Sequence, residues 1–555
     1  MEEIIMYECP NCAANLKFDI ASQMLTCEYC GTAVDPYSIT KERDAEETTD
    51  YEVILFTCPQ CGGEILSEDT TAATFCSYCG AATILDSRMS RERRPGCIVP
   101  FTKTKEDCKR SYTKMMRRAI FTPKELKDAG HIEKFRGIYM PYWVYGFAKK
   151  GAVRIPGSRT HRRGDYLITK HYNLDCELEE DYQGIAYDAS STFSDSLSSA
   201  IAPFDLREGK EFTPSFLSGF YADTSDVYKG AYHSEAEELF LSDACERARK
   251  AVGKPRYHVG REGNRSGLER ALRPDPETVS EELAMLPVWF LAYRKDDRVA
   301  YAVVNGQTGK AAADLPVDIR KYLIGSLILA VPIFLLLNMF LTITPTRILV
   351  FAMLLAFVSI WVSNRQFADI FQRETGAEDI GMEAVRPGDL QETQPEKPKG
   401  AGNLGIGSRY FFILIMCGIM LIGMLLPMFF VTVAKFLDAG LVLQVLNIMP
   451  IITVGLMFVS FAFVCWWNIS GNKRRKAVKM PFKQKIPTLV KPMGAIALAI
   501  LILLIHPVRD EFYYIGSFVC MGMVCWSFVD IIRHHNTLTT RKLPQLNRRG
   551  GDENA

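Results

Sequence analysis

Two stretches of the 555-residue chain, CPNCAANLKFDIASQMLTCEYCG (residues 9–31) and CPQCGGEILSEDTTAATFCSYCG (residues 58–80), share one cysteine pattern. Both have the spacing C-x2-C-x14-C-x2-C, and each cysteine of the second stretch lies 49 residues after its counterpart in the first. Tyr29 and Tyr78 repeat at the same offset. A constant offset at this many positions indicates an internal duplication.

Each stretch contains the four thiolates of a zinc ribbon, because each C-x-x-C turn supplies two ligands of a tetrahedron. Disulfides or redox-active pairs are the alternative, but matched quartets in an expected reducing compartment favour metal. All four ligands are sulfur, so no position is open to water and we expect structural ions. Glycine after the second cysteine, as at Gly31, Gly62 and Gly80, relieves backbone strain around the metal. The predicted ligands of the two zinc ions are Cys9, Cys12, Cys27 and Cys30, and Cys58, Cys61, Cys76 and Cys79.

The two predicted ribbons are strongly acidic. Residues 1–86 contain sixteen Asp or Glu residues and only three basic residues, Lys17, Lys41 and Arg43. Each four-thiolate zinc site adds a further charge of about −2. Such a surface repels phosphate, and neutralisation of phosphate by Lys and Arg dominates nucleic-acid binding. We therefore expect the ribbons to dock a protein and not to bind nucleic acid.

The charge reverses after the second ribbon. Between Arg88 and Arg118 there are eleven Lys or Arg residues and three acids. Cys108, Tyr112 and Met115 have helical spacing, which predicts an amphipathic helix over about 104–120. The simplest interpretation is a solvated surface helix. A partner for the acidic ribbons and a contact with anionic lipid headgroups are the alternatives.

Residues 91–320 are predicted to form a cytoplasmic α+β domain. Aromatic and β-branched runs predict strands at 137–155, 165–187 and 286–316, the last containing the polar hairpin RKDDR (294–298). Apolar periodicity predicts helices at about 104–120, 194–206 and 234–252.

The sequence of this domain does not suggest an enzyme. It contains no Gly-rich phosphate loop, no G-x-S-x-G and no H-E-x-x-H motif. GREGNRSG (260–267) is interpreted as a loop, because no strand-to-helix setting is predicted around it. The histidines have no ligand spacing, and RTHRRGD (159–165) is interpreted as a solvated basic turn.

Long apolar runs in the C-terminal part predict an integral membrane protein. Basic residues are concentrated in alternate loops: six between the second and third runs, eight between the fourth and fifth, and five in the tail. By the positive-inside rule, both termini and the head lie in the cytoplasm. The acidic start MEEIIMYECP has no signal-peptide pattern, which agrees. Six transmembrane helices are predicted, at about 323–341, 348–363, 410–434, 445–467, 492–506 and 512–529.

The predicted spans contain no Asp, Glu, Lys or Arg, and Asn338 and Asn447 are their most polar interior residues. Transporters usually need buried ionisable groups, so an anchor or assembly platform is favoured over a transporter. The expected multidomain organisation is zinc ribbon 1 (1–45), zinc ribbon 2 (46–90), the α+β domain (91–320), transmembrane hairpins (321–365, 409–468 and 492–532), a flexible linker (366–408), a basic loop (469–491) and a basic tail (533–555).

Three further phrases carry a resemblance: CIVPFTKTKEDCKRSYTKMMRRAIFTPKEL (97–126), IEKFRGIYMPYWVYGF (132–147) and LPVWFLAYRKDDRVAYAVVNGQTGK (286–310). With the ribbons, they resemble a family of bacterial TFIIB-type zinc-ribbon-containing membrane proteins over residues 1–320. Members often carry one ribbon and one or two spans, whereas two ribbons and six spans are expected here. The resemblance implies partners among SPFH (flotillin-like), TPM-domain or phage-shock-type proteins.

Together these features lead us to expect a membrane-anchored adaptor or scaffold that docks cytoplasmic proteins at the bacterial inner membrane, in an envelope-stress or membrane-remodelling assembly. The expected cofactors are two structural zinc ions. The expected partners are the lipid bilayer and proteins, and the sequence is compatible with a homo-oligomer. A membrane-tethered nucleic-acid-binding regulator and a transporter or channel with a zinc-ribbon regulatory head are the alternatives.

Overall fold

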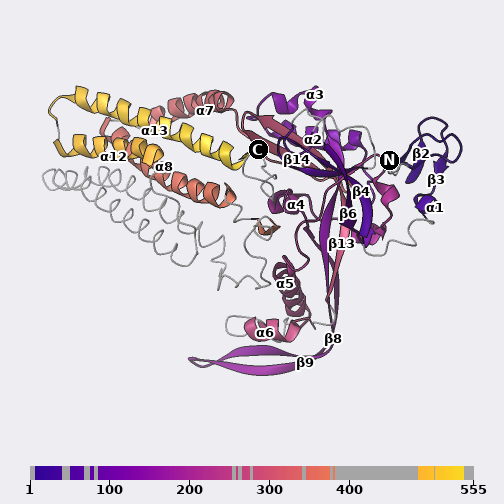
Figure 1. Ribbon diagram of the computed structural model, residues 1–555. Helices are drawn as coiled ribbons and strands as arrows, with labels where there is room; N and C mark the ends of the chain where they lie inside the picture. Colours follow the sequence, from indigo (N-terminus) through magenta and orange to yellow (C-terminus); the bar gives the residue numbers. More distant parts are fainter. Residues whose placement is uncertain are drawn as a thin grey trace. The chain divides into compact units, whose positions relative to one another are not determined.

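The chain forms two compact units. The first contains Met1–Thr344, Val362–Pro387 and Cys525–Ala555, and the second contains Pro345–Trp361 and Gly388–Val524. Figure 1 shows the elements of both units coloured along the sequence. The computed structural model describes residues 7–40, 50–67, 76–80, 86–252, 258–259, 265–274, 279–340, 345–374, 379–381, 486–505 and 507–542.

The first ribbon has its own small sheet. Strands β1 (Leu16–Asp19), β2 (Met24–Cys27) and β3 (Ala33–Val34) form a three-stranded antiparallel sheet in that order, and helix α1 (Pro36–Thr40) follows. Leu16 and Phe18 are buried while the residues between and after them are half-buried, which is the period of two expected of a strand with one covered face.

A 13-stranded sheet forms the core of the first unit, with the order β10-β7-β13-β8-β11-β5-β4-β6 along its main path. Its strands are β4 (Asp50–Thr57), β5 (Glu64–Ser67), β6 (Asp86–Arg93), β7 (Cys97–Ile98), β8 (Arg136–Arg163), β9 (Tyr166–Asp188), β10 (Lys210–Glu211), β11 (Tyr221–Ala222), β12 (His258–Val259), β13 (Ser280–Lys295), β14 (Arg298–Asn305), β15 (Ala311–Ala313) and β16 (Arg541–Lys542).

The strands of the second ribbon belong to this large sheet. Strand β5 pairs with β4 on one side and with the two-residue strand β11 on the other, and β11 pairs in parallel with β8. The ranges 46–90 and 91–320, which the sequence predicts as separate domains, therefore share one sheet and one core.

The centre of the sheet is covered on both faces. Along β8, Tyr139 packs in one apolar cluster with Tyr112 of helix α2 (Lys105–Arg118). Met140 points to the other face and packs in a cluster with Ile201 of helix α4 (Asp195–Ile201). Strands buried on both faces read as continuous apolar runs, which explains the sequence GIYMPYWVY.

The helices predicted at about 104–120 and 234–252 are confirmed as α2 and α5 (His233–Val252). The helix predicted at 194–206 is shorter than expected, since α4 ends at Ile201. Helix α2 begins with a capping box, in which Thr104 and Asp107 satisfy each other's backbone N–H groups. The shorter helices are α3 (Ala129–Ile132), α6 (Arg265–Leu272) and the 3-10 turns η1 (Glu125–Lys127), η2 (Leu206–Glu208) and η3 (Pro214–Leu217).

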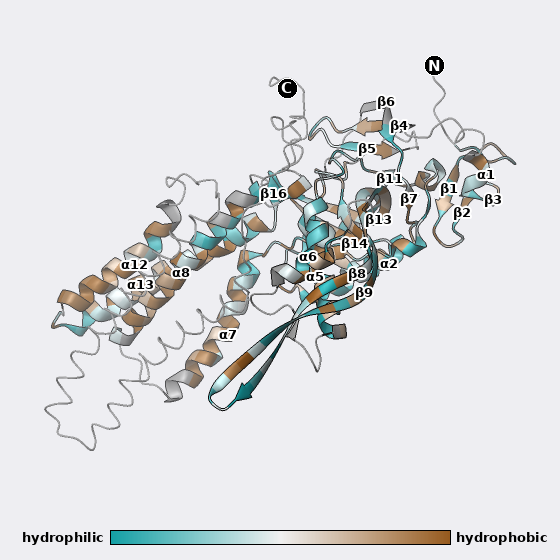
Figure 2. Ribbon diagram, turned by 90° about the horizontal axis from the view of Figure 1, so that it is seen from below, coloured by the Kyte–Doolittle hydropathy of each residue, from teal (hydrophilic) through white to brown (hydrophobic). Residues whose placement is uncertain are grey.

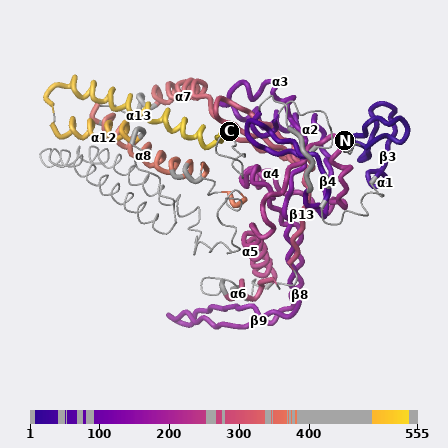
Figure 3. The backbone as a smooth tube through the Cα atoms, in the orientation of Figure 1, coloured from indigo at the N-terminus to yellow at the C-terminus, as the bar shows by residue number. Residues whose placement is uncertain are grey.

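Strands β8 and β9 form a long arm. They pair from Tyr142 opposite Asp188 to Arg163 opposite Tyr166, and the turn contains Gly164 at φ +63°. Figure 3 shows the two strands side by side to this turn. The strand predicted at 137–155 thus continues to Arg163. The sequence did not reveal this outer part as a strand, because it packs on no core and therefore lacks the apolar pattern that marks a strand.

Four apolar helices match four of the predicted spans: α7 (Ile319–Phe340), α8 (Pro345–Glu374), α12 (Ile486–Ile505) and α13 (Asp510–Leu538). Their apolar character is visible in Figure 2. Among the described residues, α7, α8 and α13 are long and apolar enough to cross a membrane, and the apolar part of α12 is shorter, at Leu489–Ile505. The total of six is not confirmed, since the spans predicted at 410–434 and 445–467 lie outside the described residues.

In the second unit, small residues allow the helices to pack closely. Ala352 and Ala356 of α8, and Ala495 and Ala499 of α12, are fully buried in one cluster with Cys520 of α13. Small side chains at helix contacts are typical of membrane bundles, where backbones approach closely and dispersion replaces the hydrophobic effect.

Candidate metal centres

The four C-x-x-C turns share one backbone arrangement. In the second stretch, the Gly62 N–H donates to the Cys58 carbonyl (2.7 Å), and the Cys58 N–H donates to the Gly63 carbonyl (2.9 Å). Gly80 donates to Cys76 in the same way (3.0 Å). These bonds curl each turn so that both of its thiols point to one side.

The residue after the second cysteine is left-handed in all four turns. Gly31, Gly62 and Gly80 have φ of 73°, 67° and 70°, which confirms the predicted role of glycine. The fourth turn has Ala13 at φ 56°, with its N–H donating to the Cys9 carbonyl (2.8 Å). Alanine is strained in this conformation, and the cysteine pattern gives no sign of that strain.

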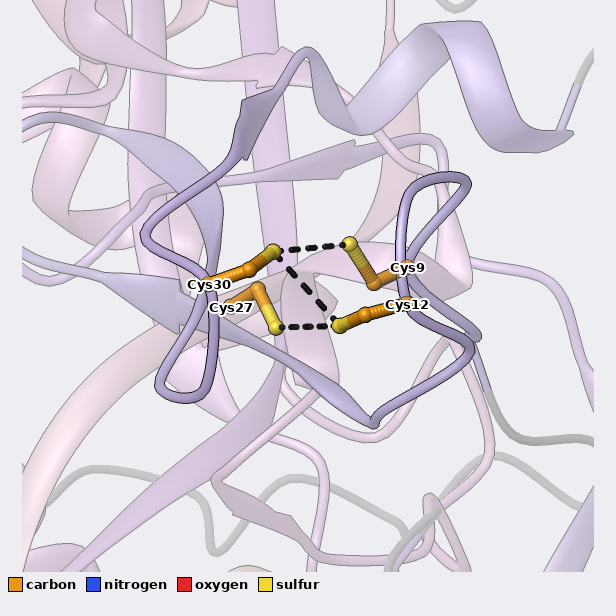
Figure 4. A group of neighbouring side chains, drawn as sticks. All are labelled: Cys9, Cys12, Cys27 and Cys30. Carbon is orange, nitrogen blue, oxygen red and sulfur yellow. Dashed lines mark hydrogen bonds between the residues drawn. The ribbon is translucent and has the colours of Figure 1, made fainter.

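The first cysteine cluster is half-open to solvent. Sγ–Sγ distances are 3.5 Å for Cys9 and Cys30, 3.4 Å for Cys12 and Cys27, and 3.5 Å for Cys12 and Cys30 (Figure 4). Cys9 and Cys27 are buried, whereas Cys12 and Cys30 are exposed.

The second cluster is closed. The Sγ atoms of Cys58 and Cys79 are 3.8 Å apart, as are those of Cys61 and Cys76. None of these four residues is more than 1% exposed. The two copies of one motif therefore differ in environment, although their spacing is identical.

Both clusters fit a tetrahedral metal ion. Within each, all four Sγ atoms lie within 4.8 Å of one another, and a zinc–sulfur bond of 2.3 Å places the sulfurs of a tetrahedron about 3.8 Å apart. All eight cysteines are free thiols, which argues against the disulfide alternative. The two groups could hold two metal ions, as the spacing predicts. Among the described residues, no other group of His, Cys, Asp and Glu side chains has such geometry.

The electrostatics of the clusters also favour a bound cation. Hydrogen bonds from the Thr32 hydroxyl and backbone lower the pKa of Cys30 to about 6. In the closed cluster, the neighbouring Cys58 sulfur raises the pKa of both Cys61 and Cys76, and burial adds to the effect. Four thiolates cannot share so small a buried volume unless a divalent ion compensates their charge.

The second cluster is held by an aromatic residue of its own motif. Tyr78, between Cys76 and Cys79, is 2% exposed, and its ring meets the ring of Phe290 edge-on at 6.3 Å. The Tyr301 hydroxyl donates to the Tyr78 carbonyl at 2.8 Å. A Cβ added to Gly63 would lie 2.6 Å from the Tyr78 ring, so this approach requires glycine.

The corresponding tyrosine of the first ribbon points to solvent. Tyr29, between Cys27 and Cys30, is 90% exposed. This ribbon contacts the head through its other side, where the rings of Phe18 and Tyr37 lie 5.2 and 5.7 Å from that of Phe216. The difference between Tyr29 and Tyr78 could not be found from a repeat in which both occupy the same position.

The first ribbon also keeps its acidic surface. Its described residues, 7–40, contain four acids and one base, and the ammonium group of that base, Lys17, pairs with Glu28 at 3.1 Å. The first ribbon thus presents an exposed aromatic ring beside two exposed thiols and a net negative charge.

A partly buried ionic cluster, which no sequence pattern revealed, ties the ends of two apolar helices to the head. We call it the polar joint, and it consists of Arg298, Asp314, Arg373, Glu374, Arg541 and Lys542. Asp314 meets Arg373 (3.3 Å) at the end of α8 and Arg541 (3.9 Å) just after α13. Burial raises the pKa of the Asp314 carboxyl, although the guanidinium groups of Arg541 and Arg373 act to lower it.

Arg298 fastens the segment after α13. Its guanidinium donates to the carbonyls of Thr537 and Thr540, both at 2.8 Å, and to the Thr540 hydroxyl at 2.7 Å. Strand β16 then pairs with β14, with Arg298 opposite Lys542. Charged residues so far apart in sequence carry no local pattern that predicts their meeting.

The remaining sequence-based hypotheses have mixed outcomes. His233 Nδ1 lies 2.9 Å from a Glu281 carboxylate oxygen, so this histidine has a partner within the head and, in the part of the chain that the structure describes, no ligand set around it. The setting of GREGNRSG differs from expectation, since β12 ends at Val259 and α6 begins at Arg265, while 260–264 lie outside the described residues. The expectation that the chain is not an enzyme stays a prediction.

Comparison with known proteins gives one informative relative. The chain is 34% identical over 325 residues to the uncharacterized protein YdjG of Bacillus subtilis (strain 168), an alignment that covers 57% of this chain and 92% of the relative. The relative is therefore much the shorter protein. No family model matches the chain, and no solved structure has a significant match to it.

Proposed function

The chain belongs to the same family as YdjG, and we propose that it is a membrane-anchored adaptor that docks cytoplasmic proteins through its first zinc ribbon. One observation carries this proposal: the duplicated motif buries Tyr78 in the head but leaves Tyr29 exposed. Large aromatic side chains are enriched at the centres of protein interfaces.

The metal is proposed to be zinc in both clusters. Four thiolates at tetrahedral separations suit zinc, which has no redox chemistry and is held in closed sites of this kind. In the second cluster the ion stabilises the core of the head. In the first, it fixes the turn that presents Tyr29.

The charge of the first ribbon indicates the chemistry of the partner. A surface with four acids, one paired base and a metal–thiolate centre of about −2 attracts a basic protein surface and repels nucleic acid. The partners suggested by family resemblance, SPFH (flotillin-like), TPM-domain and phage-shock-type proteins, are proposed on that ground alone.

The membrane arrangement is part of the proposal. Three helices have the length and composition of membrane spans, and the distribution of Lys and Arg between loops favours a multi-pass protein of the inner membrane with the head and both termini in the cytoplasm. The head would then display the first ribbon to cytoplasmic partners.

The test is capture of a defined partner from native membranes. A photo-crosslinking residue at position 29 should join the full-length chain to an SPFH, TPM-domain or phage-shock-type protein, and the same residue at position 166 should not. Tyr166 is the matched control, because it is 77% exposed at the tip of the β8–β9 arm. Equal crosslinking at both positions, or no protein of these kinds at position 29, would contradict the proposal.

A further inference from the structure

The turn that follows helix α2 lies against the first turns of helix α7. The ring of Phe121 meets that of Tyr322 edge-on at 5.3 Å, and a Cβ at Gly325 would lie 2.7 Å from the Phe121 ring. The Asp318 N–H donates to the Phe121 carbonyl (2.8 Å), and the Lys321 ammonium donates to the Thr122 carbonyl (2.7 Å). The end of a basic helix is therefore fixed beside the start of an apolar one.

Helix α7 has the properties of a helix in lipid. None of its membrane-length window is buried within the structure, and large apolar side chains are exposed from Leu323 onward. Arg320 precedes them and is exposed. The change from charged to apolar exposed residues at 320–323 marks the level at which the hydrocarbon region begins.

The turn at the end of α2 carries charge and apolar surface at this same level. Arg117 and Arg118 are exposed, and among the described residues neither has an acidic partner. Ile120, two residues on, is 63% exposed. The Ile120 N–H donates to the Arg118 carbonyl (3.1 Å), so the chain turns tightly between the arginines and Phe121.

We propose that Arg117, Arg118 and Arg320, together with Ile120 and Phe121, form a binding site for the headgroup of an anionic phospholipid at the surface of the bilayer. Guanidinium groups bind phosphate with two parallel hydrogen bonds. Ile120 and Phe121 enter the boundary between headgroups and acyl chains beside α7. The site orients the head on the membrane through a second contact besides the spans.

The geometry selects lipid over the other interpretations of this basic helix. A solvated surface helix would not need its end packed on a span, and a partner for the acidic first ribbon would not need exposed apolar residues at the level of the bilayer. The inference does not depend on partner docking by Tyr29. It depends only on α7 lying in a membrane.

The experiment compares lipid retention by full-length variants. Wild-type protein, R117Q/R118Q and R159Q/R163Q are placed in nanodiscs made from equal parts of phosphatidylcholine and phosphatidylglycerol, and the lipids that remain bound on release are counted by native mass spectrometry. The second variant is the matched control, since it removes the same charge from exposed arginines at the tip of the β8–β9 arm. The metal content and the unfolding temperature of each protein show that the head is folded.

The wild type should retain phosphatidylglycerol in preference to phosphatidylcholine, and R117Q/R118Q should bind it about thirtyfold more weakly, since each basic residue near an anionic surface is worth about 1 kcal/mol. R159Q/R163Q should behave as the wild type. The proposal is wrong if R117Q/R118Q keeps the preference, if the control loses it equally, or if the wild type has none and retains nucleic acid instead.

A second measurement covers the case in which R117Q/R118Q does not fold. Phosphatidylglycerol bound to the wild type should be released by rising salt concentration, and R320Q alone should weaken its binding about fivefold. Retention that is independent of salt and unchanged in R320Q would overturn the proposal.

Discussion

The hydroxyl of Tyr301 donates a hydrogen bond of 2.8 Å to the carbonyl of Tyr78, although 223 positions separate the two residues. The guanidinium carbon of Arg541 also lies over the ring of Tyr301, at 5.8 Å from the centroid of that ring. One side chain therefore contacts both the turn that holds the second cysteine cluster and the strand that follows the last apolar helix. The second metal centre is part of the core of the head.

Substitution of Tyr301 by Phe should accelerate release of the second metal ion. The change leaves the buried Tyr78 carbonyl without its donor, which costs on the order of 1–3 kcal/mol. We expect the slower phase of metal release to a chelating dye to become about tenfold faster, while the faster phase, from the half-open first cluster, is unchanged.

Tyr37→Phe is the control for this experiment, because it removes a tyrosine hydroxyl bonded to a backbone carbonyl beside the first ribbon, that of Glu211 at 2.9 Å. It should leave the slow phase unchanged. A slow phase equally accelerated in both variants would show that the Tyr301 contact has no specific role.

Ala13→Gly should stabilise the first metal centre. Ala13 is left-handed at φ 56°, a conformation that costs a non-glycine residue about 1–2 kcal/mol, partly offset by the greater flexibility of unfolded glycine. The metal affinity of the first cluster, measured by chelator competition, should rise about fivefold.

Gly31→Ala gives the opposite test in the same cluster. A Cβ at Gly31 would meet no atom within 4 Å, so only the strain of φ +73° is introduced. Affinity should fall about fivefold. If both substitutions change affinity in the same direction, left-handed strain does not govern these turns.

Arg298→Ala should release the segment after α13. The variant loses three hydrogen bonds to Thr537 and Thr540, each charge-assisted. Trypsin cleavage after Lys542 in the full-length protein should become at least about tenfold faster. The Arg294→Ala variant, altered in the same β-hairpin, should be cleaved by trypsin at the wild-type rate. Equal cleavage rates in the two variants would show that Arg298 does not hold the segment after α13 in place.

Acid should destabilise the head in part through His131. Burial, with the nearby Lys134, lowers the pKa of His131, whose ring meets that of Tyr293 edge-on at 5.5 Å. Because the folded pKa lies below the unfolded value of about 6.5, the unfolded chain takes up the proton first, and stability is lost as pH falls below that value. His131→Phe keeps the aromatic contact and removes the titration.

The unfolding temperature of the full-length protein should therefore fall less in His131→Phe than in the wild type between about pH 7.5 and about pH 5.5. His161→Gln, at the exposed tip of the arm, should follow the wild type. An identical fall in all three proteins would rule out a contribution from His131.

The sequence predicted both cysteine clusters and most elements of the head, since these depend on local patterns. Ligand spacing identified all eight thiols, and the periodicity around Tyr112 and Met115 identified α2. These features are determined by neighbours in the chain, where residue order is directly informative.

The features that the sequence did not reveal depend on partners far along the chain. The pairing of β5 with β11, which merges the second ribbon into the head, joins Leu66 to Ala222. The exposure of Tyr29 and the burial of Tyr78 depend on whether the head supplies a surface such as Phe290 and Tyr301. Pairing between distant segments leaves no periodic signal in either segment alone.

The central claim is that the two copies of one metal-binding motif have different roles. The second copy is part of the core of the head, and the first presents Tyr29 to a partner. Metal content and thermal unfolding of the full-length C12S/C30S and C61S/C76S variants test it most directly. We predict two metal ions in the wild type, one in C12S/C30S with the unfolding transition of the head retained, and loss of that transition in C61S/C76S. Retention of the transition in C61S/C76S, or its equal loss in both variants, would contradict the account.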